Sequence, residues 1–248
     1  KPFFSQKTPI IFTSIETAEI IKYASNSFLA TKIAFINEVA DLCEVTGANV
    51  QEVASAMGID KRIGKNFLHA GPGYGGSCFP KDVKSFSATA KKLNVKLSIV
   101  DAAHSSNQKR TVKIASKIIK YYNDNLKNIT LTMLGLSFKP NTDDIRESTS
   151  LIIAKELLNK SAKIKVYDPK AMKNVKKEMG ELEFCENAYE ACQRSKGLII
   201  ATEWNEFKAL DLIKVKSLME KPVIFDLRNI FEQNEITALG IEYFGIGK

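Results

Sequence analysis

One short stretch of the sequence combines a glycine-rich segment with a cysteine, a lysine and an aspartate. It reads GPGYGGSCFPKD over residues 71–82, and its cysteine is Cys78. A thiol at the start of a helix and close to a lysine ammonium is favoured in its thiolate form, because the helix N-terminus and the ammonium both supply positive potential. A thiolate attacks carbonyl carbon, and glycines let backbone N–H groups approach a ligand. The stretch therefore predicts covalent catalysis by Cys78, although a free thiol that only fills space would also fit the pattern.

The composition is typical of a globular protein that spans no membrane. Of the 248 residues, 44% are hydrophobic and 26% are charged, and the apolar runs are far shorter than a membrane span. The formal net charge of +8 suits anionic ligands, but the lysines are spread along helix-like segments without interleaved aromatic residues. We therefore expect neither a nucleic-acid partner nor a membrane partner.

The cysteines and histidines argue against a metal site. Cys43, Cys78, Cys185 and Cys192 form no CxxC pair, and two histidines are too few for the usual zinc sites. Unpaired cysteines are typical of a reducing compartment, so the sequence predicts a cytoplasmic protein. No signal peptide opens the chain. It begins with Lys1 rather than methionine, so we expect either a fragment or a processed form of a longer polypeptide.

The first half of the chain is predicted to be entirely helical. Apolar residues recur at helical spacing over residues 14–47, and Gly47 is a natural end for this long helix. Shorter helices are predicted over about 49–57, 79–93 and 100–125. Together they form an all-helical domain that we place at residues 1–127.

The second half has the pattern of a doubly wound parallel sheet. Short β-branched runs such as KIKVYDP, GLIIAT and PVIFDLRN alternate with amphipathic helical segments. Such alternation is typical of βαβ units and a parallel sheet. The sequence therefore predicts an α/β fold, in which the helical domain is followed by a doubly wound sheet domain over residues 128–248.

The long helix over residues 14–47 is apolar on more than one face. Ile21, Leu29, Ile33 and Ile36 lie off the stripe formed by Ile20, Ala24, Phe28 and Phe35. A helix that is apolar on two sides is usually buried on two sides. Its own domain can cover one side, and pairing with the same helix of a second copy can cover the other. The sequence therefore predicts a homodimer formed through this helix, although a helix wrapped wholly within its own chain is the alternative.

The predicted sheet lacks the glycine pattern with which a doubly wound sheet binds a dinucleotide. The segment LGLSFKPNTDDIRES at residues 134–148 contains one glycine where GxGxxG would stand. We expect Lys139 and the helix start near Ser148 to hold a nucleotide phosphate instead. Arg228 follows another strand at the same edge of the sheet. Ordinary surface turns remain the alternative for both Lys139 and Arg228.

Four stretches closely resemble one known family. They resemble the central and C-terminal parts of the UDP-glucose/GDP-mannose dehydrogenase family, and they read ETAEIIKYASNSFLATKIAFINE, DKRIGKNFLHAGPGYGGSCFPKD, LGLSFKPNTDDIRES and ATEWNEF. Members of this family begin with a nicotinamide-binding domain that carries GxGxxG and two active-site glutamates. That domain is absent from this chain, so the resemblance implies that this chain alone is inactive.

The resemblance implies a two-step oxidation of a nucleotide sugar with NAD. The C6 alcohol loses a hydride to NAD, Cys78 captures the aldehyde as a thiohemiacetal, a second hydride transfer gives a thioester, and water releases the acid. Ser77 before the cysteine resembles members that convert UDP-glucose to UDP-glucuronate, because members acting on N-acetylated sugars tend to have histidine there. The alternatives are GDP-mannose or another nucleotide sugar, and a dimerising UDP-sugar-binding module without catalysis.

The resemblance also assigns catalytic residues. Lys22 and Asn26 lie one turn apart on a helix and would bind the reacting oxygen, and Asp82 would position the water or take its proton. Lys81 and Arg146 match positions that contact the cofactor. Without the resemblance, Lys22 and Asn26 would be assigned to the solvated face of a long helix.

Ten residues are expected to bind the substrate. Arg62 resembles an arginine that reaches into the site of a neighbouring subunit, although by itself it would be a solvated loop charge. The other residues expected to bind the substrate are Phe67, Leu68, His69, Ala70, Gly71, Gly75, Phe138, Lys139 and Arg228.

Overall fold

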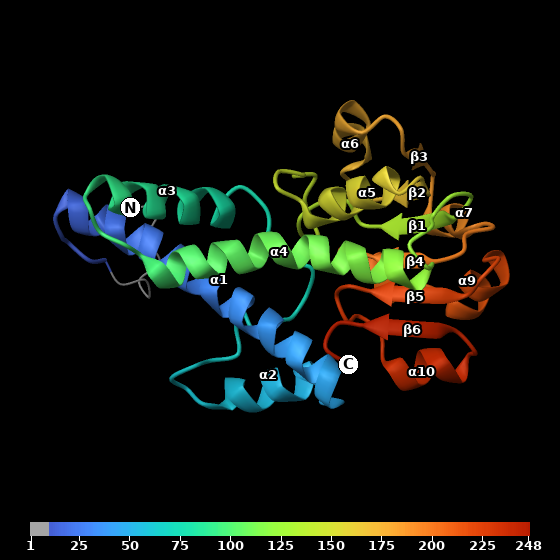
Figure 1. Ribbon diagram of the computed structural model, residues 1–248, viewed down its shortest axis with the longest axis horizontal. Helices are drawn as coiled ribbons and strands as arrows, with labels where there is room; N and C mark the ends of the chain where they lie inside the picture. Colours follow the sequence, from blue (N-terminus) through green and yellow to red (C-terminus); the bar gives the residue numbers. More distant parts are fainter. Residues whose placement is uncertain (1–9) are drawn as a thin grey trace.

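A long helix opens the part of the chain that the structure, a computed structural model, describes, namely residues 10–248 (Figure 1). This helix, α1, spans Ile15–Thr46. Ser14 caps its first turn by accepting a hydrogen bond from the Thr17 N–H at 3.2 Å, and Gly47 ends it with φ of +74°. The helix predicted over residues 14–47 is therefore present with the expected ends.

Three more helices complete the helical half. They are α2 (Val50–Ile59), α3 (Phe79–Lys92) and α4 (Ser98–Tyr121). α4 ends before the predicted limit because Asn123 and Asp124 take left-handed φ values of 55° and 60°. α1 packs against both α3 and α4, and α4 extends from the helical half to the sheet, where it packs on α5 (Thr149–Asn159) (Figure 1).

The second half contains a six-stranded sheet in which every neighbouring pair of strands is parallel. The strand order is β3-β2-β1-β4-β5-β6, and the strands are β1 (Thr130–Leu134), β2 (Lys163–Tyr167), β3 (Glu183–Phe184), β4 (Leu198–Ile200), β5 (Val223–Asp226) and β6 (Glu242–Gly245). The prediction of a helical domain followed by a doubly wound parallel sheet is thus confirmed. The order reverses between β1 and β4, and ligands of such sheets bind beyond the carboxyl ends of strands at this point.

Helices cover both faces of the sheet because neighbouring strand residues point to opposite sides. Met133, Ile199 and Phe225 join a core cluster with α4 and α5, whereas Ile200 and Ile224 join a second cluster on the other face. The remaining helices are α6 (Met172–Glu178), α7 (Ala188–Cys192), α8 (Asn205–Lys208), α9 (Leu212–Leu218) and α10 (Gln233–Ala238). The first cluster also contains residues of α1, so the domain boundary placed at residue 127 stays a prediction.

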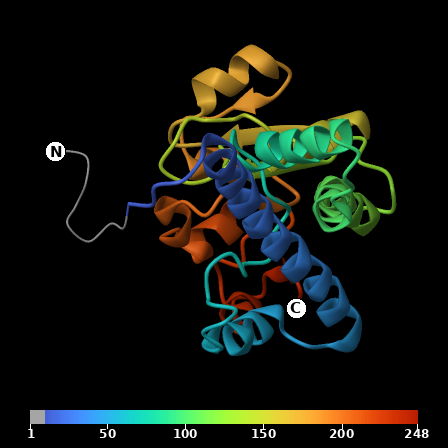
Figure 2. The ribbon, with the colours of Figure 1, turned by 90° about the vertical axis from the view of Figure 1, so that its left-hand side faces the viewer.

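The residues after β6 pack against the helical half. The Val50 N–H at the start of α2 donates to the Gly247 carbonyl at 2.9 Å, and the Gly247 N–H donates to Glu44 Oε1 at 3.1 Å. A Cβ at Gly247 would lie 2.6 Å from a Val50 methyl carbon, so no larger residue fits. The C-terminus accordingly lies beside the junction of α1 and α2 (Figure 2).

No helix within residues 10–248 combines the length and the apolar character needed to cross a bilayer.

Candidate active site

Cys78 lies directly before the first residue of α3, and its side chain is exposed. Pro80 fits the first turn of α3 because N–H groups there need no helical acceptor. The other three cysteines, Cys43, Cys185 and Cys192, are buried, and burial raises the pKa of Cys192 to about 12. Of the four thiols, that of Cys78 is therefore the one placed to react with a dissolved molecule.

A buried carboxylate lies one turn into α3. Asp82 accepts a hydrogen bond from Asn26 Nδ2 at 2.6 Å and another from Lys81 Nζ at 2.7 Å, and Lys22 Nζ lies 3.9 Å from its Oδ2. Burial by itself raises the pKa of Asp82, but the hydrogen bonds from Lys81 and Asn26 and the charge of Lys22 outweigh it and leave the pKa below its usual value. The packing of α1 on α3 thus brings all four residues together around an ionised carboxylate, and their roles in catalysis stay predictions.

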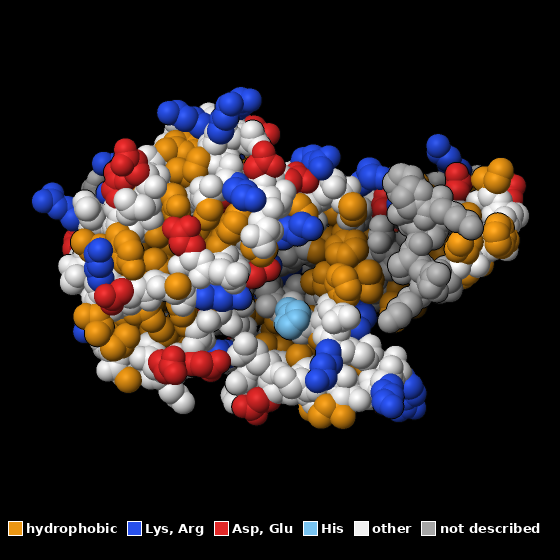
Figure 3. All heavy atoms as spheres, turned by 180° about the vertical axis from the view of Figure 1, so that it is seen from behind, with side chains coloured by type: hydrophobic (Ala, Val, Ile, Leu, Met, Phe, Trp, Pro, Cys, Tyr) orange, Lys and Arg blue, Asp and Glu red, His pale blue; other side chains and the backbone are white. Residues whose placement is uncertain are grey.

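A cavity of about 430 Å³ lies where the glycine-rich segment meets the sheet. It opens at the point where the strand order reverses, since Phe138 and Lys139 follow β1, Glu203 follows β4 and Arg228 follows β5. Phe79, which follows Cys78 in the chain, also lines it. Seen from behind, the surface is hollowed between the two halves of the molecule (Figure 3).

Seven of the residues expected to bind the substrate line this cavity. They are Phe67, His69, Gly71, Gly75, Phe138, Lys139 and Arg228. Leu68 and Ala70 instead line a neighbouring cavity of about 590 Å³, which shares Asn66, His69 and Arg228 with the first. The two cavities therefore lie on either side of one short segment.

Two glycines lie in close contact with the turn before α5. The Gly76 N–H donates to the Arg146 carbonyl at 2.9 Å, and a Cβ on Gly76 would lie 2.6 Å from the Phe138 ring. A Cβ on Gly75 would lie 2.1 Å from the Glu147 carbonyl oxygen. Gly75 is required because backbone meets backbone there, and Gly76 is required because of the Phe138 ring and a left-handed φ of +82°.

Arg228 is held in place, whereas Lys139 is exposed. The Arg228 Nε donates to the Ala201 carbonyl at 2.8 Å and lies 3.2 Å from Glu203 Oε2. The Lys139 ammonium lies 5.3 Å from the centre of the Phe138 ring at the cavity edge. Arg228 can therefore define a fixed binding position, and Lys139 can reach toward a ligand.

The turn after β1 does not fit a dinucleotide. The Leu136 and Ser137 N–H groups both donate to Asp168 Oδ2, at 2.7 and 3.1 Å. In a dinucleotide-binding sheet, the N–H groups of this turn bind the pyrophosphate. The Asp168 carboxylate already occupies them here, which agrees with the missing GxGxxG pattern. No cluster of three or more potential metal ligands occurs within residues 10–248.

Besides Cys78 and the cluster around Asp82, the predicted site residues Arg62 and Arg146 are also not among those that line the cavity. The Arg62 side chain is 90% exposed and binds Asp60 with an N–O distance of 2.6 Å. The exposed Arg146 side chain binds Asp144 at 2.7 Å. The cross-subunit role of Arg62 and the cofactor contacts of Lys81 and Arg146 stay predictions.

Sequence reasoning missed Asn37, Tyr74 and Glu203, which also line the cavity. Asn37 Oδ1 accepts a hydrogen bond from the Gly71 N–H at 2.8 Å. Asn37 follows Asn26 by about three helical turns, so the two side chains share one face of α1. The eleven-residue spacing from Asn26, a predicted site residue, could therefore have identified Asn37 from the sequence.

Comparison with known proteins identifies the family. Residues 16–109 match the family model "UDP-glucose/GDP-mannose dehydrogenase family, central domain", and residues 132–233 match the "UDP binding domain" of the same family. The two matches together cover well over half of the chain. This chain belongs to the UDP-glucose/GDP-mannose dehydrogenase family.

Two similar members of the UDP-glucose/GDP-mannose dehydrogenase family come from bacteria. A UDP-glucose 6-dehydrogenase of Rhizobium meliloti is 44% identical over 100% of this chain and 57% of its own length. One from Bacillus subtilis is 43% identical over 97% of this chain and 52% of its own length. This chain thus spans little more than half the length of these relatives.

Solved structures of the family share the fold. The UDP-glucose dehydrogenase of Pyrobaculum islandicum has a TM-score of 0.84 and 36% identity, covering 92% of this chain and 51% of that one. A UDP-D-ManNAc dehydrogenase of Pyrococcus horikoshii has a TM-score of 0.82 and 26% identity, covering 97% of this chain and 54% of that one.

Proposed function

We propose that the complete polypeptide, meaning this chain with any further domain of the natural protein, oxidises UDP-glucose to UDP-glucuronate. The observation that carries the proposal is the exposed Cys78, whose carbonyl accepts a hydrogen bond from the N–H of Asp82 in the Lys22–Asn26–Asp82 cluster. The next residue in the chain, Phe79, lines the cavity at the sheet's reversal point. The names of the bacterial relatives support UDP-glucose as the substrate. Ser77 before Cys78 supports the same choice.

Each residue of the cluster has a task in this reaction. Lys22 and Asn26 donate hydrogen bonds to the C6 oxygen and stabilise the negative charge that develops on it. The Cys78 sulfur bonds to C6 of the aldehyde, and water later breaks the thioester and returns the thiol. Asp82, ionised and buried, orients that water and accepts its proton.

NAD would supply the hydride acceptor for both oxidation steps. Because Asp168 occupies the N–H groups after β1, this sheet offers the dinucleotide no pyrophosphate site. We therefore propose that NAD binds mainly to a further domain of the complete polypeptide. Lys81 and Arg146, both exposed close to Cys78, would meet the cofactor from this chain.

Calorimetry with this chain tests the substrate. We expect UDP-glucose to bind, and we expect Lys139→Ala to weaken binding roughly 10- to 150-fold, because losing a hydrogen bond to a charged group costs about 1.5–3 kcal/mol. Lys208→Ala, an exposed lysine on α8, is the control and should bind as wild type. Failure of the wild type to bind UDP-glucose, or tighter binding of GDP-mannose, would contradict the proposed substrate.

We also propose a homodimer formed through α1. Phe28, Phe35 and Leu42 recur every seven residues along this helix and are 67%, 50% and 63% exposed. The opposite face, with Ala30, Ile36 and Ala40, is buried in the chain's own core. A stripe of large apolar side chains on one helix is well suited to pairing with its own copy about a two-fold axis.

Sedimentation checks this pairing. The wild-type chain should sediment as a dimer at micromolar concentration, and Phe35→Glu should yield monomers because a charge would be buried between the helices. Ile213→Glu is the control, since Ile213 on α9 is 68% exposed but lies far along the chain from α1. A monomeric wild type would refute the dimer.

A further inference from the structure

The backbone of the segment Gly71–Tyr74 is hydrogen-bonded to side chains of the two long helices, α1 and α4. The Gly71 N–H donates to Asn37 Oδ1 of α1 at 2.8 Å, and the Gly71 carbonyl accepts from Arg110 Nε of α4 at 3.0 Å. Thr111 Oγ1 donates to the Pro72 carbonyl at 2.9 Å. These bonds lie in a buried environment, where each is costly to leave unmade.

Asn107 fastens the end of the same segment. Its Oδ1 accepts from the Tyr74 N–H at 2.8 Å, and its Nδ2 donates to the Tyr74 carbonyl at 3.0 Å. Asn107, Arg110 and Thr111 are three and four residues apart, so they form one face of α4. We call Asn37 and these three residues the loop clamp.

The loop clamp leaves other backbone groups available. Within residues 10–248, neither the Gly73 N–H nor the Gly75 N–H donates a hydrogen bond. Both glycines line the 430 Å³ cavity. Free N–H groups on a rigid backbone bind anionic or carbonyl oxygens well, since no ordering cost remains at binding.

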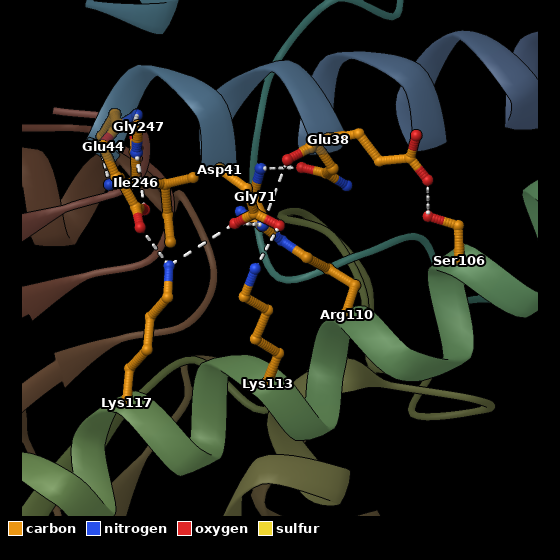
Figure 4. Close-up of polar contacts among 12 residues, drawn as sticks. Glu38, Asp41, Glu44, Gly71, Ser106, Arg110, Lys113, Lys117, Ile246 and Gly247 are labelled. Carbon is orange, nitrogen blue, oxygen red and sulfur yellow. Dashed lines mark hydrogen bonds and ion pairs between the residues drawn. The ribbon is translucent and has the colours of Figure 1, made fainter. Parts of the chain in front are cut away.

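Arg110 connects the loop clamp to an ion-pair cluster. Its side chain is 3% exposed, and its Nη1 donates to the Asn37 carbonyl at 3.2 Å and to the Asp41 carboxylate. Asp41 also binds Lys113 Nζ at 2.8 Å, and both basic side chains extend from α4 toward Asp41 on α1 (Figure 4). One planar guanidinium thus reaches Gly71, Asn37 and Asp41 at once, which the single ammonium of a lysine cannot do.

We propose that Arg110 is a positioning residue, which holds the Gly71 backbone so that the Gly73 and Gly75 N–H groups face the nucleotide sugar. The inference rests on the proposed function, because it assumes that this cavity binds the substrate. Arg110 itself lies behind the segment and touches α1 rather than the cavity. It therefore acts on binding through the loop.

The test compares two basic residues that share Asp41. Arg110→Lys keeps the charge but loses the bridge to Gly71, so UDP-glucose should bind at least about tenfold more weakly by calorimetry. Amide hydrogen exchange at Gly71 and Tyr74 should become faster in the same variant. Lys113→Met removes another partner of Asp41 without touching the loop, so it should change neither quantity.

A second variant covers the case in which Arg110→Lys does not fold. Thr111→Val preserves shape and removes only the bond to Pro72, so it should weaken UDP-glucose binding a few-fold and speed exchange in the segment. In the complete polypeptide, both variants should raise KM for UDP-glucose and leave KM for NAD unchanged. A general loss of structure would change both constants.

The outcomes separate the inference from the proposed function. The positioning role would be overturned if Arg110→Lys keeps both the wild-type affinity for UDP-glucose and the wild-type rate of amide exchange. If Arg110→Lys does not fold, unchanged affinity of Thr111→Val for UDP-glucose would overturn it. A wild-type chain that binds no UDP-glucose would overturn the proposed function. In that case, faster amide hydrogen exchange at Gly71 in Arg110→Lys would still support the conclusion that Arg110 holds the Gly71 backbone in place. Unchanged exchange would refute that conclusion.

Discussion

In the complete polypeptide, Cys78→Ser is expected to abolish formation of UDP-glucuronate, with a fall in rate of about 10³-fold or more. A serine hydroxyl is a far weaker nucleophile than a thiolate, and the adduct that it forms would turn over poorly. The measurement is the amount of UDP-glucuronate released over time, followed by mass spectrometry.

The other three cysteines are the controls for this experiment. Cys43, Cys185 and Cys192 are buried away from solvent, so their alanine variants should keep nearly the wild-type rate when folded. Brief treatment of this chain with iodoacetamide should alkylate Cys78 before the others. Release of the acid by Cys78→Ser at a rate near that of the wild type would rule out the covalent mechanism.

Gly75→Ala is expected to have the second large effect, on both stability and binding. The new Cβ would lie 2.1 Å from the Glu147 carbonyl oxygen, and neither backbone segment can yield as a flexible side chain would. We expect a loss of about 1–3 kcal/mol in the free energy of unfolding, as for other overpacked sites. We also expect UDP-glucose binding to be lost, since the segment would be pushed away from the sheet.

Gly180→Ala is the matched control, because its Cβ would lie 3.7 Å from the Lys176 carbonyl oxygen, an ordinary contact. Denaturant titration of both variants measures the difference. Equal stability of the two variants would contradict the close approach of Gly75 to Glu147.

Features with local causes were predictable from the sequence. The long helix was predicted with its ends because Ser14 and Gly47 are capping residues that act within one turn. Lys22 and Asn26 share a helix face for the same local reason. The resemblance then linked them to Asp82, which the structure places within hydrogen-bonding distance of Asn26.

Features that depend on distant contacts were not predictable. Asn107 and Arg110 have the spacing of an ordinary polar helix face, and only the packing of α4 turns that face toward a segment more than thirty residues earlier. Asp168 likewise looks like a turn residue after a strand. Two of its six hydrogen bonds are local, to the Lys170 and Ala171 N–H groups. The other four, from Leu136, Ser137 and Trp204, depend on the sheet order, in which β1 lies between β2 and β4.

The contact of Gly247 with α1 and α2 has a consequence for synthesis of the chain on the ribosome. Gly247 and Glu44 are 203 positions apart, and at ordinary translation rates this separation corresponds to about 10 to 40 seconds. During that interval the Val50 N–H lacks its acceptor, and the apolar notch around Ala40 and Val50 stays uncovered. The helices made first can therefore complete their packing only when the residues after β6 emerge, and the nascent chain exposes a site to which chaperones can bind until then.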